Sequence, residues 1–202
     1  MKIVIIKYNA GNIFSVRYAV KRVGFEAEIT DDPAVIRAAD RVIFPGVGEA
    51  GTTMQYLRER GMDELIRSLT QPVLGICIGM QLMCRHSEES DTDCLDIFDT
   101  PVELFVPPEP NPMHYKVPHM GWNTLEYSNV PLFQDLGPNP YVYFVHSYHP
   151  TICAHTVAVT DHIVPFSSAL QKDNFYALQF HPEKSGEVGA RILHRFITMR
   201  HD

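Results

Sequence analysis

The sequence contains one tryptophan, four cysteines and no apolar run long enough to cross a bilayer. The cysteines, at positions 77, 84, 94 and 153, form no Cys-x-x-Cys pair, which argues against a disulfide framework. Basic residues are also scarce, because 17 lysines and arginines face 24 aspartates and glutamates, for a net charge of −7. This charge argues against a nucleic acid or an anionic membrane surface as the main partner.

The amino terminus shows no export signal. Its short apolar run, Met1 to Ile6, is followed by Lys7 and Tyr8 without a small-residue cleavage site, so it indicates a first core strand rather than a signal peptide. Together with the cysteine pattern, this predicts a cytosolic protein. Ten histidines are present, but none forms His-x-x-x-His or His-Glu-x-x-His, so we expect no metal site.

Strand and helix patterns alternate through the first half of the chain. The expected strands are 3–6, 25–30, 41–44 and 73–76, and the expected helices are 13–23, 33–39, 49–60 and one after residue 76 that includes Cys84. A turn is expected at 9–12. From Thr100 the pattern changes to strands or hairpins at 102–106, 122–127, 141–146, 156–160 and 167–180, a loop with five prolines at 107–118, and a last helix at 185–199. Residues 1–202 are therefore predicted to form one α/β domain with a mixed, mostly parallel central sheet.

Cys77 stands in Gly-Ile-Cys-Ile-Gly-Met-Gln, where a short apolar strand runs directly into a helical pattern. This is the context of a nucleophile elbow, whose tight turn needs small residues such as Gly75 and Gly79. A helix amino terminus favours a thiolate, and its free N–H groups can stabilise a neighbouring oxyanion. The alternative is that Cys77 is a small buried hydrophobic residue, as most cytosolic cysteines are.

The candidate base lies a hundred residues later, in Gln-Phe-His181-Pro-Glu183-Lys. A core strand precedes it, so we expect extended geometry at the strand end to send His181 and Glu183 to the same side. The carboxylate can then hold one ring nitrogen while the other faces the thiol. By itself this pair could be a surface ion pair, but both motifs follow buried strands, and sites gather at the carboxyl ends of strands.

Together these motifs resemble the signature pair of the class I glutamine amidotransferases, which have a flavodoxin-like fold. Pro45-Gly46-Val47-Gly48 is similar to their oxyanion loop, although by itself it could be an ordinary turn. The resemblance implies a Cys77-His181-Glu183 triad and oxyanion donors on the backbone N–H groups of Val47 and Ile78. It also implies contacts to L-glutamine from Gly46, Gln81, Glu89, Ser147 and Tyr148. Glu89 could instead be one acid in an acidic run.

Other segments resemble the glutaminases of imidazole glycerol phosphate synthase. They are Tyr8 to Val16, Tyr143 to Tyr148 and, most distinctively, Pro-His-Met-Gly-Trp-Asn at 118–123. The chain departs from that pattern at Lys7 and Asn9, and at 90–94, where the usual glycines are missing. The implied partner is a TIM-barrel cyclase, in a heterodimer, with contacts at Asn12, Met120, Trp122, Tyr143 and Lys184. Trp122, expected in a loop, could instead be a half-buried core residue, and Lys184 an idle surface charge.

The implied reaction hydrolyses glutamine to glutamate through a cysteine thioester and delivers ammonia to the cyclase, with no cofactor. The rivals are the glutaminases of anthranilate, guanylate or pyridoxal phosphate synthesis, against which the 118–123 segment argues. A non-catalytic module with the same fold is a further rival, opposed by the intact triad. A dinucleotide-binding domain is weaker still, because no Gly-x-Gly-x-x-Gly follows the first strand.

Overall fold

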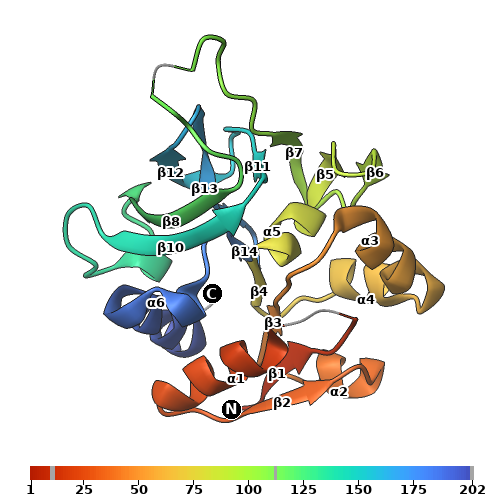
Figure 1. Ribbon diagram of the computed structural model, residues 1–202. Helices are drawn as coiled ribbons and strands as arrows, with labels where there is room; N and C mark the ends of the chain where they lie inside the picture. Colours follow the sequence, from red (N-terminus) through yellow and green to blue (C-terminus); the bar gives the residue numbers. More distant parts are fainter. Residues whose placement is uncertain (10–11, 112, 201–202) are drawn as a thin grey trace.

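An eight-stranded mixed sheet forms the centre of the molecule in the computed structural model, which describes residues 1–9, 12–111 and 113–200 (Figure 1). The strand order is β2-β1-β3-β4-β14-β13-β12-β9. The strands from β2 to β14 run parallel, and β13, β12 and β9 continue the sheet in antiparallel pairs. The predicted mixed sheet is confirmed.

The parallel strands are short and buried. They are β1 (Ile3–Ile6), β2 (Ala27–Thr30), β3 (Arg41–Phe44), β4 (Val73–Ile76) and β14 (Phe175–Leu178). Three of them have the predicted bounds, because a continuous apolar run covered on both faces is a strong signal. Their carboxyl ends meet along one edge of the sheet, where the segments after β3, β4 and β14 come together.

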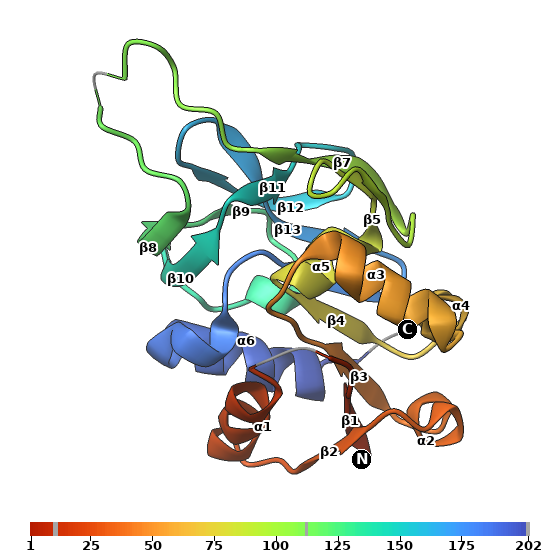
Figure 2. The same cartoon turned by 45° about the vertical axis from the view of Figure 1, so that its right-hand side comes forward.

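Helices cover both faces of the sheet (Figures 1 and 2). One face packs against α1 (Ile13–Arg22) and α6 (Gly186–Thr198), and the other against α2 (Pro33–Arg37), α3 (Ala50–Glu59), α4 (Met62–Arg67) and α5 (Ile78–Met83). The helix α4 was not predicted, because it has only six residues and follows Gly61, whose backbone is in the left-handed region. The predicted turn at 9–12 lies partly outside the described residues.

The antiparallel part of the sheet consists of β9 (Glu126–Tyr127), β12 (Thr156–Asp161), β13 (Pro165–Lys172) and β14. The predicted turn inside 167–180 is confirmed, and Asp173 has a φ of 51° there. A two-stranded ribbon of β8 (His119–Thr124) and β10 (Tyr141–His146) stands apart from the central sheet. It lies above α6 in Figure 1.

A third sheet has the order β11-β7-β5-β6, from β5 (Cys84–Ser87), β6 (Thr92–Asp93), β7 (Phe98–Leu104) and β11 (Tyr148–Pro150). The expectation that Cys84 continues a helix is wrong, because α5 ends at Met83 and Cys84 begins β5, although its side chain is buried. The strand expected at 102–106 is β7, shifted toward the amino terminus. These strands are short and partly polar, so their pattern is weak.

Two single-turn helices complete the fold, η1 (Pro131–Phe133) and η2 (Pro182–Lys184). The proline-rich segment 107–118 is irregular wherever it is described, as predicted. Among the described residues, no helix combines the length and the apolar character that crossing a membrane requires.

Candidate active site

Cys77 stands at a sharp turn between β4 and α5. Its φ of 54° and ψ of −110° place a non-glycine residue in a rarely populated backbone region, and such strain is concentrated at functional sites. Hydrogen bonds hold the turn on both sides, since Cys77 N–H donates to the Leu178 carbonyl at 2.8 Å and Gln81 N–H donates to the Cys77 carbonyl at 3.1 Å. The predicted nucleophile elbow is confirmed as a backbone geometry.

The two glycines that flank Cys77 are required for packing. A Cβ atom at Gly79 would lie 2.0 Å from the carbonyl oxygen of Phe44, on β3. A Cβ atom at Gly75 would lie 3.0 Å from the carbonyl carbon of Gly79 and 2.8 Å from the Met83 sulfur. The turn at Cys77 therefore packs closely against its own helix, α5, and against the neighbouring strand, β3. Only glycine leaves enough room for this packing at positions 75 and 79.

His181 and Glu183 form a buried pair after β14. The His181 Nδ1 and Glu183 Oε1 atoms are 2.7 Å apart, and both side chains are fully buried. The expected extended geometry is wrong, because Pro182 begins the turn η2 and Glu183 lies inside it. Proline suits the first position of such a turn, which needs no N–H donor.

The charge of the imidazole depends on its two neighbours. Burial disfavours the charged ring, but Cys77 and Glu183 together outweigh burial and raise the pKa of His181. The Nε2 atom is buried and has no well-aligned hydrogen-bond partner among the described residues. The pair can therefore hold a proton close to the sulfur of Cys77.

Glu183 is tied to α1 as well as to His181. The side-chain amide of Asn12 donates a hydrogen bond to Glu183 Oε1, and Arg22 Nη2 donates to the Glu183 backbone carbonyl at 3.2 Å. Asn12 was predicted as a partner contact, and its side chain is half-buried against this carboxylate. It therefore contacts the candidate triad directly.

A cavity of about 320 Å³ opens beside Cys77. Its lining comes from five separate segments: Val47, Gly48, Cys77, Ile78, Gln81, Glu89, Pro118, Val145, His146, Ser147 and Tyr148. All but one of the residues predicted to contact substrate are among them. The exception is Gly46, which is buried behind the wall, where a Cβ atom would meet Ile78 and Tyr8.

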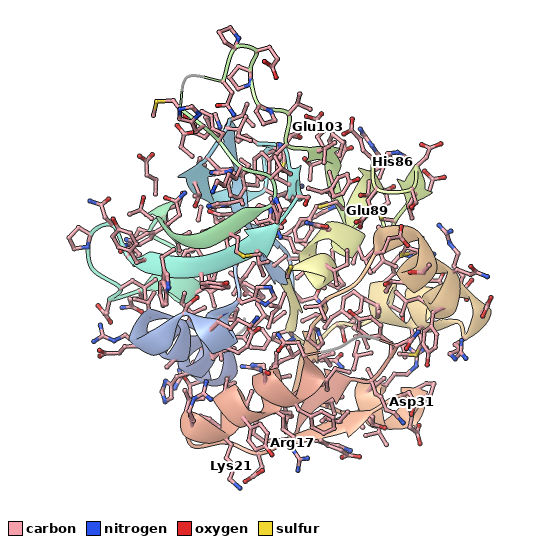
Figure 3. All side chains as sticks on the ribbon, in the orientation of Figure 1. Arg17, Lys21, Asp31, His86, Glu89 and Glu103 are labelled. Atoms are coloured by element: carbon pink, nitrogen blue, oxygen red, sulfur yellow. The ribbon has the colours of Figure 1, made fainter. Side chains whose placement is uncertain are left out.

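Glu89 reaches the cavity from the turn between β5 and β6 and lies between α5 and the start of α3 (Figure 3). Its Oε2 atom accepts a hydrogen bond from Ala50 N–H at 2.8 Å, and partial burial raises the pKa of the carboxyl group. Next to it, Ser90 and Asp91 have φ values of 57° and 46°. The turn therefore keeps a left-handed backbone without the glycines that the sequence lacks there.

Two segments that line the cavity contain the predicted oxyanion donors, the backbone N–H groups of Val47 and Ile78. Val47 and Gly48 follow β3, and Gly48 has a φ of 147°. Ile78 is the first residue of α5, so its N–H has no acceptor within the helix. An N–H group without an acceptor at the start of a helix, directly after Cys77, can stabilise negative charge next to the sulfur.

Two polar residues near Cys77 were not predicted from the sequence, Gln179 and His146. The side chain of Gln179 is fully buried, and its Nε2 atom lies 3.8 Å from the sulfur of Cys77. His146 Nδ1 lies 2.7 Å from the Tyr148 carbonyl oxygen. Gln179 precedes His181 by two positions, so strand alternation could have indicated that it faces the same site.

Most of the predicted partner residues form one group beside the cavity, which we call the rim: Met120, Trp122, Tyr143 and Lys184. Met120 is 64% exposed and Trp122 is 54% exposed. Trp122 packs edge-on against Tyr143, whose ring lies 5.7 Å from Lys184 Nζ. Trp122 lies within β8, which agrees with the strand expected at 122–127 and not with the loop expected around this residue, and its exposure excludes a core position.

A larger cavity, of about 530 Å³, lies between α6, η1 and the end of α1. Its charged side chains pair with each other, Arg191 with Glu187 and Arg195 with Asp135. Within the described ranges, no group of three or more histidines, cysteines and acids is placed to hold a metal ion. The cavity beside Cys77 is therefore the better candidate for chemistry.

The chain is similar in sequence to proteins of known family. Residues 6–199 match the family model for Glutamine amidotransferase class-I. The chain is 59% identical over 199 residues to imidazole glycerol phosphate synthase subunit HisH of Bacteroides thetaiotaomicron, which covers 98% of this chain and 100% of that protein. It is 47% identical over 196 residues to the protein of the same name from Pasteurella multocida, with 96% of each chain covered.

Solved structures agree on the fold. The crystal structure of a glutamine amidotransferase superposes with a TM-score of 0.71 at 19% identity, with 96% of each chain covered. PurLQS from Thermotoga maritima gives 0.69 at 15% identity, with 97% of each chain covered. Because a HisH protein is 59% identical to it and the family model matches almost its whole length, the chain belongs to the class I glutamine amidotransferases, in the group of the HisH proteins.

Proposed function

We propose that this amidotransferase hydrolyses L-glutamine at Cys77 and passes the ammonia to a cyclase subunit of imidazole glycerol phosphate synthase. One observation carries the proposal. Cys77, which has a strained backbone conformation, lines a cavity, and the buried His181–Glu183 pair lies next to it. Nucleophile, base and orienting group are the three parts that covalent amide hydrolysis requires.

The first half of the reaction forms a thioester. The Cys77 thiolate attacks the side-chain carbonyl carbon of glutamine, and the oxyanion accepts hydrogen bonds from the N–H groups of Val47 and Ile78. His181 gives its proton to the departing nitrogen, so the C–N bond breaks and ammonia leaves. The raised pKa of His181 supports this role, because the ring carries a proton when the tetrahedral intermediate collapses.

The second half returns the enzyme to its starting state. His181, now neutral, takes a proton from water, and the resulting hydroxide attacks the thioester through a second oxyanion. Collapse breaks the C–S bond, releases glutamate and leaves the thiolate beside the charged imidazole. Glu183 holds Nδ1 throughout, so that Nε2 is the nitrogen that exchanges protons.

Gln81 and Glu89 are proposed to bind the amino-acid end of glutamine. Both amide hydrogens of Gln81 are already used, by the Tyr148 carbonyl at 2.9 Å and Gln179 Oε1 at 3.0 Å. The side-chain amide oxygen of Gln81 is therefore free to accept a hydrogen bond. It would accept one from the α-ammonium group of glutamine, which would also contact the Glu89 carboxylate. Ser147 and Tyr148 also line the cavity, and their backbone is proposed to lie near the carboxylate of glutamine.

A glutamine-like diazo-ketone tests the nucleophile. It should label Cys77 alone, as read by peptide mass spectrometry, and glutamine should protect the site. Cys153 is a built-in control, because it is the most exposed of the four free cysteines. Labelling of Cys153 in preference to Cys77 would show that exposure alone governs the reaction and would remove the proposed nucleophile.

The cyclase is proposed to dock over the rim. Ammonia must reach the synthase unprotonated, so the mouth of the site has to be covered by the acceptor. Met120 and Trp122 expose large apolar side chains next to that mouth, and large aromatic side chains are over-represented among interface anchors. Asn12 lies on the same side through its contact with Glu183, so a partner at the rim would be close to the triad.

A coupled assay tests the partner. Glutamate release should rise when the cyclase and its phosphorylated ribulosyl ligand are added together, and the product of ammonia addition should form. A cyclase that fails to bind, or that leaves the glutaminase rate unchanged, would contradict the proposal. We place the reaction in the cytosol, in keeping with four free thiols.

A further inference from the structure

A chain of hydrogen bonds joins the sulfur of Cys77 to the strand β8. It begins at Gln179, whose Nε2 atom is 3.8 Å from the sulfur and whose Oε1 atom is 3.0 Å from Gln81 Nε2. An amide turned the other way would point its oxygen at the sulfur and oppose a thiolate. Because Gln81 can only donate through its nitrogen, the contact between the two amides fixes which end of Gln179 faces Cys77.

Gln81 is itself fixed by the backbone. Its nitrogen has two hydrogens, and they go to Gln179 and to the Tyr148 carbonyl, 2.9 Å away. Both amide side chains are buried, where exchange of a hydrogen bond with water is costly. The Tyr148 carbonyl is therefore the anchor of the pair.

A pair of buried histidines holds that anchor from the other side. The Tyr148 carbonyl can only accept, so Nδ1 of His146, 2.7 Å away, carries a hydrogen. The His146 Nε2 atom then accepts from His119 Nδ1 at 3.1 Å. The His119 Nε2 atom accepts in turn from Asn123, at 3.4 Å, while the other amide hydrogen of Asn123 goes to the Asp161 carbonyl.

This arrangement requires both rings to be neutral. Burial and the neighbouring histidines lower the pKa of His119 to about 4 and lower the pKa of His146 well below its usual value. Every donor from Asn123 to His146 then points toward Tyr148. Since His119 and Asn123 alternate along β8 with Met120 and Trp122, the same strand carries both the rim and the start of the chain.

We propose that Gln179 donates a hydrogen bond to the Cys77 thiolate during catalysis, and that the His119–His146 pair is a positioning device that holds this donor in place. Gln179 touches a reacting atom, whereas the two histidines act only through the Tyr148 carbonyl and Gln81. The inference rests on the proposed role of Cys77 as nucleophile. It adds a specific route by which the rim and the nucleophile are connected.

The test measures the alkylation of Cys77 by iodoacetamide across pH, read residue by residue by mass spectrometry, with Cys153 as the internal reference. Gln179→Met keeps the length of the side chain and removes the donor. Its Cys77 rate at neutral pH should fall about three- to tenfold, the effect of one charge-assisted hydrogen bond. The pH at which the rate reaches half its maximum should rise. Cys153 should not change.

Two substitutions at His146 separate positioning from packing. His146→Phe keeps a ring among Phe105, Phe144 and Phe166 but cannot donate. His146→Asn loses the ring but keeps a donor near the place of Nδ1. We expect His146→Phe to slow the alkylation of Cys77, as Gln179→Met does. We expect His146→Asn to retain most of the wild-type rate.

Two results would overturn the proposal. One is a folded Gln179→Met variant, checked by thermal melting, with the wild-type rate and pH profile at Cys77. The other is the same rate of Cys77 alkylation in His146→Phe and His146→Asn. This second result would count against the proposal even if Gln179→Met does not fold. Iodoacetamide reacts with Cys77 without glutamine turnover. A failure of the proposed function would instead be seen as no glutamate release by the wild type, which is a separate measurement.

Discussion

Acid should destabilise this protein through the buried histidines of β8, β10 and β11. Burial lowers the pKa of His119 to about 4 and also lowers the pKa values of His146 and His149. The unfolded chain binds protons near the ordinary value of about 6.5, so it takes up protons first as the pH falls. The stability that these three histidines contribute by staying neutral is therefore fully present above about pH 6.5 and is lost as the pH falls to about 4.

The magnitude follows from the pKa difference of His119. A difference of about 2.5 pH units corresponds to about 3.5 kcal/mol at about 1.4 kcal/mol per unit, a large part of the stability of an ordinary domain. The surroundings offer little relief, because the ring stacks on His162 at 4.1 Å and meets His146 edge-on. Only His149 has a nearby acid that favours its charge, Glu88.

Urea unfolding between pH 4.5 and 7.5 measures this effect. In the wild type the free energy of unfolding should fall steadily below about pH 6.5. In His119→Phe the free energy of unfolding should depend less steeply on pH, by about 1.4 kcal/mol per pH unit, because about one proton fewer is bound on unfolding. This difference in slope should appear whatever stability the variant loses at neutral pH. His194→Asn, at an exposed position on α6, is the matched control. Parallel curves for wild type and His119→Phe would refute the reasoning.

Three further predictions concern the site and the rim. Glu183→Gln should retain at least about tenfold more glutaminase activity than His181→Ala, because a mispositioned base is better than none; wild-type activity in Glu183→Gln would contradict this. Gly79→Ala should lower the stability by about 3 kcal/mol, measured by urea unfolding, because its Cβ atom would lie 2.0 Å from the Phe44 carbonyl oxygen. Trp122→Ala should weaken cyclase binding in a titration without changing the melting temperature, since the side chain is 54% exposed; normal binding with early melting would mean that Trp122 is structural.

The sequence was most informative where one short segment contains the whole signal. Cys77 could be located because its strand, its glycines and its helix are consecutive, and local geometry follows from local residues. The pairing of His181 with Glu183 was also predicted, although the turn begun by Pro182 replaced the extended geometry. In both motifs the contacts span only a few residues.

The chain of hydrogen bonds could not be predicted in the same way. Gln179, Gln81, Tyr148 and His119 come from four distant segments, and nothing in the sequence indicated that they are linked to one another by hydrogen bonds. The third sheet was partly missed for a related reason. Strands such as Thr92–Asp93 are too short to show a period, so their position depends on their partners.

The β8–β10 ribbon has a consequence for how the molecule opens. A two-stranded ribbon is only marginally stable by itself. Two hydrogen bonds join its strand β10 to the segment after β14: His181 N–H donates to the Tyr143 carbonyl, and Tyr143 N–H donates to Ser185 Oγ. Sub-global opening of this segment would cost less free energy than opening the central strands. The backbone amides of the ribbon should therefore exchange with solvent through an opening that also releases His181, so the strand pair that carries the rim and the proposed base should fluctuate in the same event.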